Sequence, residues 1–332
     1  MENENRYLKP EEIRQLANSF QQSRILLTAL ELDIFSVLDK KMLSSVDVSI
    51  AVKADARATD RLMNALVALG FLRKTRGKFY NAENASQYLV KGKPEFMGGL
   101  FHSLGLWNTW SSLTESVKAG TSAAEHKPSP SGIDWSDAFI AAMHYRGVKE
   151  AKLLAMLLDL SNVKRMLDVG GGSGTFSMEL VKTNPKMYAV VFDLPHILPI
   201  TKKYVEAENM IDKIEFKPGS FLTDDFGSGY DLILLSAIVH MNSYDENKTL
   251  IKKCADSLNS GGQIIIKDWV MNEERTEPER GVFFALNMLV GTKSGDTFTE
   301  NEMKEWFNAA GISKIERKQT SLGGDLMIGK KA

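Results

Sequence analysis

The sequence predicts an α/β protein whose second half is a doubly wound, mostly parallel sheet and whose first half is mainly α-helical. In the second half, apolar runs of strand length alternate with amphipathic helices, which is typical of a parallel sheet covered on both faces. In the first half, helices with apolar residues three and four positions apart lead into one short β-ribbon. We therefore expect three parts, at residues 1–95, 96–160 and 161–332.

The composition narrows the class of protein and its compartment. Of the 332 residues, 43% are hydrophobic and 25% are charged, as in ordinary globular proteins. A formal net charge of −1 argues against a partner that is bound mainly through nucleic acid phosphates. The polar start is unlike a signal peptide, and no apolar run is long enough to cross a bilayer. With Cys254 as the single cysteine, we expect a cytoplasmic protein that has no membrane or nucleic acid partner.

The first ninety residues predict a winged helix. A helix that starts with Ser45 or Asp47 as its cap is followed by one that ends at Gly70, a suitable C-terminal glycine. Acidic and basic side chains interleave without a Lys/Arg stripe, so packing and dimerisation are favoured over DNA binding, which stays open as a rival role. The expected helices lie within 11–38, from 45 onward and over 59–70, and two strands surround a turn at Arg76-Gly77.

Residues 96–160 predict further helices that are rich in aromatic side chains. Most of these side chains are expected in the core or at an interface. Phe139 and Met143 are one helical turn apart, which makes them candidates to line a pocket beside the second domain, with Trp107 as a further candidate. Such a pocket would suit a flat, apolar ligand.

Polar residues follow or end the strands expected in the second half. In doubly wound sheets, ligands bind beyond the carboxyl ends of the strands. Asp168, Asp193 and Asp268 stand at such ends, and Ser236 to His240 follow another. The expected strands cover 166–170, 188–193, 214–217, 231–236 and 263–268, with two more over 314–320 and 324–329, and the helices cover 174–182, 195–207, 245–258, 278–290 and 299–310.

A glycine-rich turn joins the first of these strands to its helix, and such a turn presents backbone N–H groups to a polar ligand. The dinucleotide fingerprint fails, because Thr175 or Ser177 stands in its last position, and no P-loop lysine follows. Asp168 would repel a pyrophosphate and suit a cationic or amino-bearing ligand. Asp193, 19 residues after Gly174, stands where a carboxylate accepts ribose hydroxyls. A nucleoside joined to a cationic, phosphate-free group describes S-adenosylmethionine.

These segments together resemble the S-adenosylmethionine-dependent small-molecule O-methyltransferases, such as caffeate, flavonoid and hydroxyindole O-methyltransferases. The resemblance covers about residues 15–326 and is carried by Asp168-Val-Gly-Gly-Gly-Ser-Gly174, Val191-Phe-Asp-Leu-Pro195, Gly219-Ser-Phe221 and Ile238-Val-His240. It implies an N-terminal winged-helix domain that forms a homodimer and a C-terminal Rossmann-like methyltransferase domain.

The resemblance also implies which residues bind the cofactor. The glycine turn would cradle the methionine part, Asp193 would hold the ribose, and Leu194 would pack beside it. Ser220 and Phe221 occupy the pair that contacts adenine, although many relatives have an acid in place of Ser220, and plant relatives have a lysine in place of Ser236. The implied cofactor-binding residues are Asp168, Gly170, Gly172, Gly174, Asp193, Leu194, Gly219, Ser220, Phe221 and Ser236.

His240 stands where the family has its general base, and Asp268 stands where a carboxylate orients that base. A neutral histidine can accept a phenol-type proton near neutral pH. The usual His-Asp-Trp is replaced here by His240-Met-Asn, and a structural role for His240 stays open. The family's second carboxylate maps onto Thr297, so that acid is missing or is displaced to Asp296. No metal is expected, because no cluster has ligand spacing.

The predicted function is methyl transfer from S-adenosylmethionine to a hydroxyl of a small, flat, apolar acceptor. Met288 matches a family methionine that clamps an acceptor ring, and a role as a core methionine is the alternative. Transfer to nitrogen, sulfur or carbon on the same scaffold is the first rival function. A winged-helix regulator that binds DNA is the second.

Overall fold

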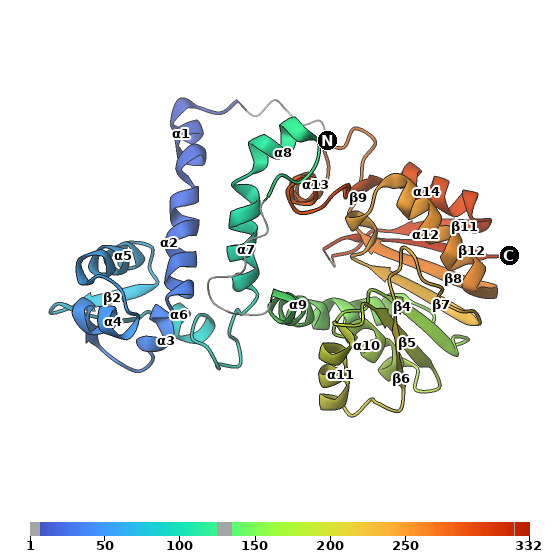
Figure 1. Ribbon diagram of the computed structural model, residues 1–332, viewed down its shortest axis with the longest axis horizontal. Helices are drawn as coiled ribbons and strands as arrows, with labels where there is room; N and C mark the ends of the chain where they lie inside the picture. The colour runs from blue at the N-terminus through green and yellow to red at the C-terminus, as the bar shows by residue number, and fades with distance from the viewer. Residues whose placement is uncertain (1–6, 125–134, 322) are drawn as a thin grey trace. The chain divides into compact units, whose positions relative to one another are not determined.

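The computed structural model describes residues 7–124, 135–321 and 323–332 (Figure 1). It divides into two compact units, residues 1–104 and 105–332, and each is described by itself. Helix α7 (Leu100–Trp110) contains the boundary between them. Within the described residues, no helix is both long enough and apolar enough to cross a membrane.

The first unit is a helical domain with a small antiparallel sheet. Leu30, Phe35, Met63 and Leu66 are each at most 2% exposed and form part of its core. Arg76 and Gly77, both with positive φ, form the two-residue turn between the paired strands β2 and β3. The elements are α1 (Pro10–Asn18), α2 (Phe20–Glu31), α3 (Ile34–Val37), β1 (Leu43–Ser44), α4 (Ser45–Ala51), α5 (Ala56–Ala68), β2 (Leu72–Thr75), β3 (Lys78–Asn81) and α6 (Glu83–Tyr88).

Two details of this unit differ from the sequence prediction. The ribbon has a third strand, because β1 pairs with β3 in the order β1-β3-β2. The cap of α4 is Ser44, whereas Ser45 or Asp47 was expected. Ser44 Oγ accepts the Asp47 N–H, and the Asp47 carboxylate accepts the Ser44 N–H at 3.0 Å. In this reciprocal capping box Asp47 is the third helical residue and Ser44 keeps an extended backbone.

The second unit is built on one seven-stranded sheet in the order β11-β12-β8-β7-β4-β5-β6. Strands β4 to β8 are parallel, and β12 runs antiparallel to β8, which confirms the predicted mostly parallel α/β fold. The strands are β4 (Arg165–Val169), β5 (Tyr188–Asp193), β6 (Ile214–Pro218), β7 (Tyr230–Ser236), β8 (Leu258–Asp268), β11 (Ile312–Lys318) and β12 (Asp325–Lys331), and β9 (Val270–Met271) pairs separately with β10 (Phe298–Thr299).

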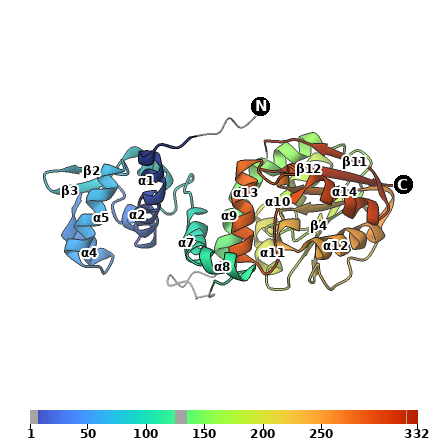
Figure 2. The same ribbon diagram turned by 90° about the horizontal axis from the view of Figure 1, so that it is seen from above.

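Helices cover both faces of this sheet because successive strand residues point to opposite sides. Met166 and Leu234 pack in a core with α9, α10 and α11, whereas Leu167 and Leu235 pack in a second core with α12 and α14 (Figure 2). The helices are α8 (Leu113–Ala119), α9 (Trp135–Leu157), α10 (Thr175–Thr183), α11 (Leu198–Ala207), α12 (Tyr244–Ser257), α13 (Glu279–Gly291) and α14 (Glu300–Ala309), with a 3₁₀ turn η1 (Val239–Met241).

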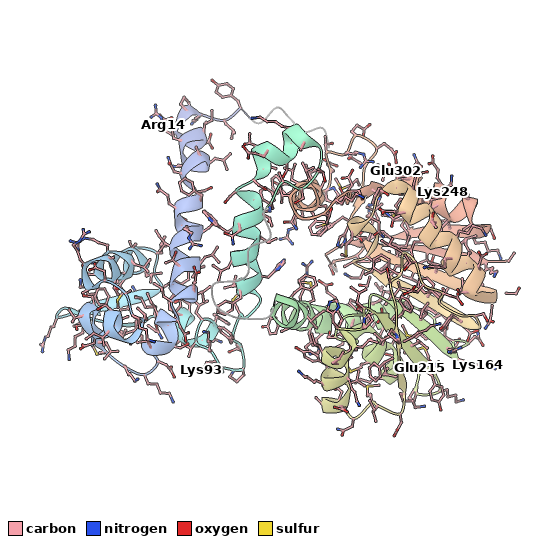
Figure 3. All side chains as sticks on the ribbon, in the orientation of Figure 1. Arg14, Lys93, Lys164, Glu215, Lys248 and Glu302 are labelled. Atoms are coloured by element: carbon pink, nitrogen blue, oxygen red, sulfur yellow. The ribbon has the colours of Figure 1, made fainter. Side chains whose placement is uncertain are left out.

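The order of the strands indicates where a ligand is expected to bind. From β4 the chain adds β5 and β6 on one side, then returns to place β7 and β8 on the other. Such a switch point leaves a crevice beyond the carboxyl ends of the strands. Lys164 and Glu215, labelled in Figure 3, lie at the amino ends and so mark the opposite end of the strands.

Candidate active site

The glycine turn lies at the carboxyl end of β4. Gly170, Gly172 and Gly174 all have positive φ, of 66°, 56° and 72°, a region that few other residues adopt readily. The Gly170 N–H donates to the Phe192 carbonyl at 2.7 Å, which fixes the turn to the end of β5. A side chain at Gly170 would overlap Ile238. The turn is therefore held close to its neighbours, and it begins α10, whose N-cap is Gly174.

Asp168 acts from beneath this turn. Its side chain is part of a residue that is only 1% exposed, and it accepts a hydrogen bond from Ser177 Oγ at 2.7 Å. A Cβ at Gly171 would lie 2.9 Å from Asp168 Cγ, so the turn rests directly on the carboxyl group. Burial, assisted by the nearby Asp193 carboxylate and opposed by the hydrogen bond from Ser177, raises the pKa of Asp168 to about 6.

Asp193 ends β5, and its carboxylate joins the glycine turn to the following residue. One oxygen accepts the Gly172 N–H at 2.8 Å, and the other accepts the Leu194 N–H at 2.7 Å. Burial raises the pKa of Asp193, and these two N–H groups act in the opposite direction. Each carboxylate oxygen can accept a second hydrogen bond, so the group can still bind two hydroxyls. Leu194 is 41% exposed beside it.

A second turn follows β6 and contains the predicted adenine contacts. The Gly219 N–H donates to the Asp193 carbonyl at 3.0 Å, and the Ser220 N–H donates to Asp224 Oδ2 at 2.8 Å. Phe221 is half-buried and packs against the core beside α12. Ser236, at the end of β7, is also half-buried. We refer to residues 219–226 as the β6 loop.

His240 and Asp268 form a buried pair at the ends of β7 and β8. His240 Nδ1 lies 2.9 Å from both carboxylate oxygens, and the two side chains are 11% and 3% exposed. The Trp269 N–H donates to Asp268 Oδ1 at 2.9 Å, which fixes the carboxylate from the far side. With Nδ1 held in this way, a neutral imidazole carries its proton on Nδ1 and has a lone pair at Nε2.

The position of the family's second carboxylate does not supply another acid to this pair. Thr297 is 2% exposed, and its hydroxyl donates to the Gly281 carbonyl at 3.5 Å. Asp296 directs its half-exposed carboxylate to Arg275, 3.4 Å away. Over residues 7–124, 135–321 and 323–332, Asp268 is the one carboxylate that bonds to the imidazole of His240.

Comparison with known proteins identifies the family. Residues 134–313 match the O-methyltransferase domain, and residues 14–92 match the O-methyltransferase dimerisation domain. The chain belongs to the O-methyltransferase family. It is a methyltransferase that uses S-adenosylmethionine, as the glycine turn and Asp193 predict.

The relatives of this methyltransferase act on different acceptor atoms. It is 29% identical to 3-hydroxy-5-methyl-1-naphthoate 3-O-methyltransferase of Streptomyces sahachiroi, over 92% of this chain and 90% of that one. It is 25% identical to the N,N-dimethyltransferase OxyT of Streptomyces rimosus, over 96% and 95% of the two chains. Among solved structures, PigF with SAH shares the fold with a TM-score of 0.86 at 22% identity, over 98% of this chain and 100% of that one.

The methyltransferase has aromatic side chains around the pair that sequence reasoning missed. Phe284, on α13, packs edge-on against the His240 ring with centroids 4.7 Å apart, and the Trp269 ring lies 6.4 Å from Phe284. Nothing in the sequence distinguishes Phe284 from its neighbour Phe283, which is 56% exposed. Only the tertiary structure selects the residue that touches the histidine.

Two partly buried polar contacts between α9 and neighbouring elements were also missed. Lys267 Nζ lies 2.7 Å from the Glu150 carboxylate, with the lysine side chain 5% exposed. The sequence does contain a signal for this pair: Lys267 follows three isoleucines in a strand that is expected to be buried, and a buried lysine needs an acidic partner. His144, which showed no functional placement in the sequence, has Nδ1 2.7 Å from Thr175 Oγ1, at the start of α10.

The predicted acceptor-binding residues lie on two helices of the second unit. Phe139 and Met143 are on α9, where Phe139 is 38% exposed and Met143 is half-buried. Met288, on α13, is 8% exposed. Among the residues that the structure describes, no group of three or more His, Cys, Asp or Glu side chains could hold a metal ion.

Proposed function

We propose that this methyltransferase moves the methyl group of S-adenosylmethionine to a hydroxyl of a small, flat, apolar acceptor, and that His240 is the general base. One observation carries the proposal: the buried His240–Asp268 pair, which holds Nδ1 and so reserves the Nε2 lone pair for a proton. A neutral imidazole is the side chain best suited to accept a phenol-type proton at neutral pH.

The residues of the glycine turn fit the cofactor. The turn approaches a ligand with backbone alone, and Asp193 retains acceptor positions for two ribose hydroxyls. We assign the ribose to Asp193, with Leu194 beside it, and the adenine to Ser220 and Phe221, with Gly219 and Ser236 nearby. The methionine part goes to Asp168 and the glycines at 170, 172 and 174. When bound, the sulfonium supplies an electrophilic methyl group.

The protein's contribution to the chemical step is alignment and removal of one proton. His240 Nε2 would take the proton of the acceptor hydroxyl as the oxygen attacks, and Asp268 would stabilise the resulting imidazolium. Phe284 restricts the imidazole from one side by its edge-on contact. Phe139, Met143 and Met288 would place the acceptor ring. Alignment of this kind supplies most of the rate enhancement when the leaving group is already good.

We propose that the protein works as a homodimer through its N-terminal domain, which we place at residues 1–95. The match of residues 14–92 to the dimerisation domain supports this. Apolar side chains are exposed on the helices there, with Ile13 at 53% and Leu16 at 67%. The monomer mass is 36.9 kDa, and light scattering on the full chain should give twice this mass.

Replacing His240 tests the proposed function. In His240→Ala, the rate of methyl transfer should fall at least about a hundredfold, the usual effect of losing a general base. The rate is measured with whichever of the test acceptors below the wild type methylates, called the responsive acceptor. The dissociation constant for S-adenosylhomocysteine (SAH) should stay within threefold. The assay follows the labelled methyl group into 1-naphthol, 3-hydroxy-2-naphthoate and the corresponding aromatic amines. Unchanged turnover in His240→Ala would show that His240 is not the base.

Transfer to nitrogen is the second candidate function. It is favoured by one observation: within the part of the chain that the structure describes, Asp268 is the single carboxylate bonded to the imidazole, where the family usually has two. An amine acceptor needs less help from a base, because it loses its proton easily after methylation. Transfer to nitrogen would be supported if the labelled methyl group were found in the aromatic amines and if His240→Ala lost little turnover.

A further inference from the structure

Lys253, on α12, reaches across to the β6 loop that contains the predicted adenine contacts. Its ammonium group donates to the Phe221 carbonyl and to the Asp224 carbonyl, the latter at 2.8 Å. It also lies over the Phe226 ring, 4.3 Å from the centroid. The side chain of Lys253 thus makes three separate contacts within the six residues from Phe221 to Phe226.

The β6 loop is anchored at two other points, and neither of them restrains Phe221. At its start, the Gly219 N–H is bound to the Asp193 carbonyl. At its end, Phe226 is fully buried against Phe192, with ring centroids 4.9 Å apart. Between these points Asp224 closes a turn on Ser220, but the carbonyl of Phe221 points to α12. Lys253 supplies the donor for it.

We propose that Lys253 is a positioning residue for the cofactor: by holding the Phe221 and Asp224 carbonyls, it fixes the β6 loop in the shape that receives the adenine. The inference rests on the proposed placement of adenine at Ser220 and Phe221. Lys253 acts through the loop backbone and touches no reacting atom. It should therefore determine how tightly the cofactor binds and leave the methyl-transfer step unchanged.

The chemistry of the contact explains why a lysine is needed. Two carbonyls that face the same point create a concentrated negative partial charge, which an ammonium group with three donors satisfies. The Phe226 ring presents its negative face to the same cation. Asp224 and Asp225 also favour the charged lysine, although burial lowers its pKa. A methionine could fill the space but could donate to neither carbonyl.

The adjacent Lys252 provides a matched control. It lies on the same helix, its side chain is 64% exposed, and it pairs with Asp256 one helical turn away at 3.0 Å. Changing it to methionine alters the charge of α12 by the same amount without touching the β6 loop. Any general effect of removing a lysine from this helix should therefore appear equally in Lys252→Met and Lys253→Met.

The test is calorimetric binding of SAH to the full-length protein and its variants. In Lys253→Met the dissociation constant should rise about tenfold, the order expected when a charge-assisted hydrogen bond is lost. In Lys252→Met it should stay within twofold. Lys253→Arg, which retains donors for both carbonyls, should recover most of the affinity. The cofactor KM should follow the dissociation constant, while kcat at saturating cofactor and the acceptor KM stay within twofold.

Hydrogen exchange of the β6 loop gives a second measurement in the absence of any ligand. The backbone N–H groups of residues 219–226 should exchange faster in Lys253→Met than in Lys252→Met. Equal SAH affinity in the two variants would overturn the inference, and so would a loss of kcat at saturating cofactor. Should Lys253→Met not fold, Lys253→Leu, which also has no donor, is expected to raise the dissociation constant for SAH in the same way. If the wild type itself does not bind SAH, the proposed function fails together with the inference.

Discussion

Asp268→Asn separates the orienting role of the carboxylate from the basicity of the histidine. Asp268 accepts three hydrogen bonds with two oxygens: from His240 Nδ1 at 2.9 Å, from the Trp269 N–H at 2.9 Å and from the His240 N–H at 3.4 Å. An asparagine has one acceptor oxygen. Its amide nitrogen would then face either the Trp269 N–H or the His240 N–H. In both orientations it would also lie beside His240 Nδ1, where it would favour a proton on Nε2.

That change removes the lone pair which the proposed mechanism needs. A rate loss of 10²–10³ is expected for the wrong tautomer, which corresponds to about 2.7–4 kcal/mol in the barrier. Because the Asp268 side chain is only 3% exposed, water cannot replace the lost charge, and stability should fall by about 1.5–3 kcal/mol. SAH affinity should not change, since the proposed cofactor contacts lie at the ends of other strands.

The assay is single-turnover methyl transfer to the responsive acceptor, with SAH binding and thermal unfolding measured in parallel. Asp245→Asn is the control, because this exposed acid lies five positions after His240 and at the start of α12. Turnover in Asp268→Asn within threefold of the wild type would refute the orienting role. A parallel loss of SAH affinity would show that the variant has disturbed the sheet edge as a whole.

Two further predictions concern buried charges. The folded pKa of Asp168, about 6, lies above its ordinary value of 3.8, so its stabilising effect is complete at low pH and is lost as pH rises through 6. Between pH 4 and pH 7 the wild type should therefore lose about 2 kcal/mol of unfolding free energy that Asp168→Asn does not lose. Urea unfolding that gives both proteins the same dependence of stability on pH would contradict this. Glu150→Gln should cost about 3–5 kcal/mol by leaving the buried Lys267 ammonium unpaired, whereas Lys267→Met should cost little. Unfolding of both variants and of the double variant measures the coupling, and additive costs would exclude it.

The fold could be predicted largely from local patterns, because strand and helix periodicity depends on which faces are buried. Errors arise where a turn residue interrupts a strand. Strand β8 was expected to begin at residue 263, yet it begins at Leu258, which pairs with Tyr230 before a shift in register. Gly261, with φ of 76°, and Gly262 lie in the irregular part of this ladder.

The sequence predicted which residues of the site lie at the carboxyl ends of strands, but it did not predict where their side chains point. Asp193 and Asp268 end their strands, and Asp168 lies one residue before the end of β4, because parallel strands bring their carboxyl ends to one edge. The direction in which a side chain points is not encoded in that pattern: Asp168 lies beneath the turn. Contacts between distant segments are still less accessible, and Lys267 and Glu150 are 117 positions apart.

The segment that replaces the second carboxylate explains how one acid can be enough. The Asp296 N–H donates to the His240 carbonyl at 3.0 Å, and a side chain at Gly295 would overlap that carbonyl. Arg275 fixes the same segment by donating to the Thr297 carbonyl at 2.6 Å. The backbone of His240 is thus held on one side while Asp268 fixes its ring on the other. If a second acid would only add orientation, this packing would supply it. Among the residues that the structure describes, Asp268 would then be the one acid on which the proposed proton-accepting role of His240 depends.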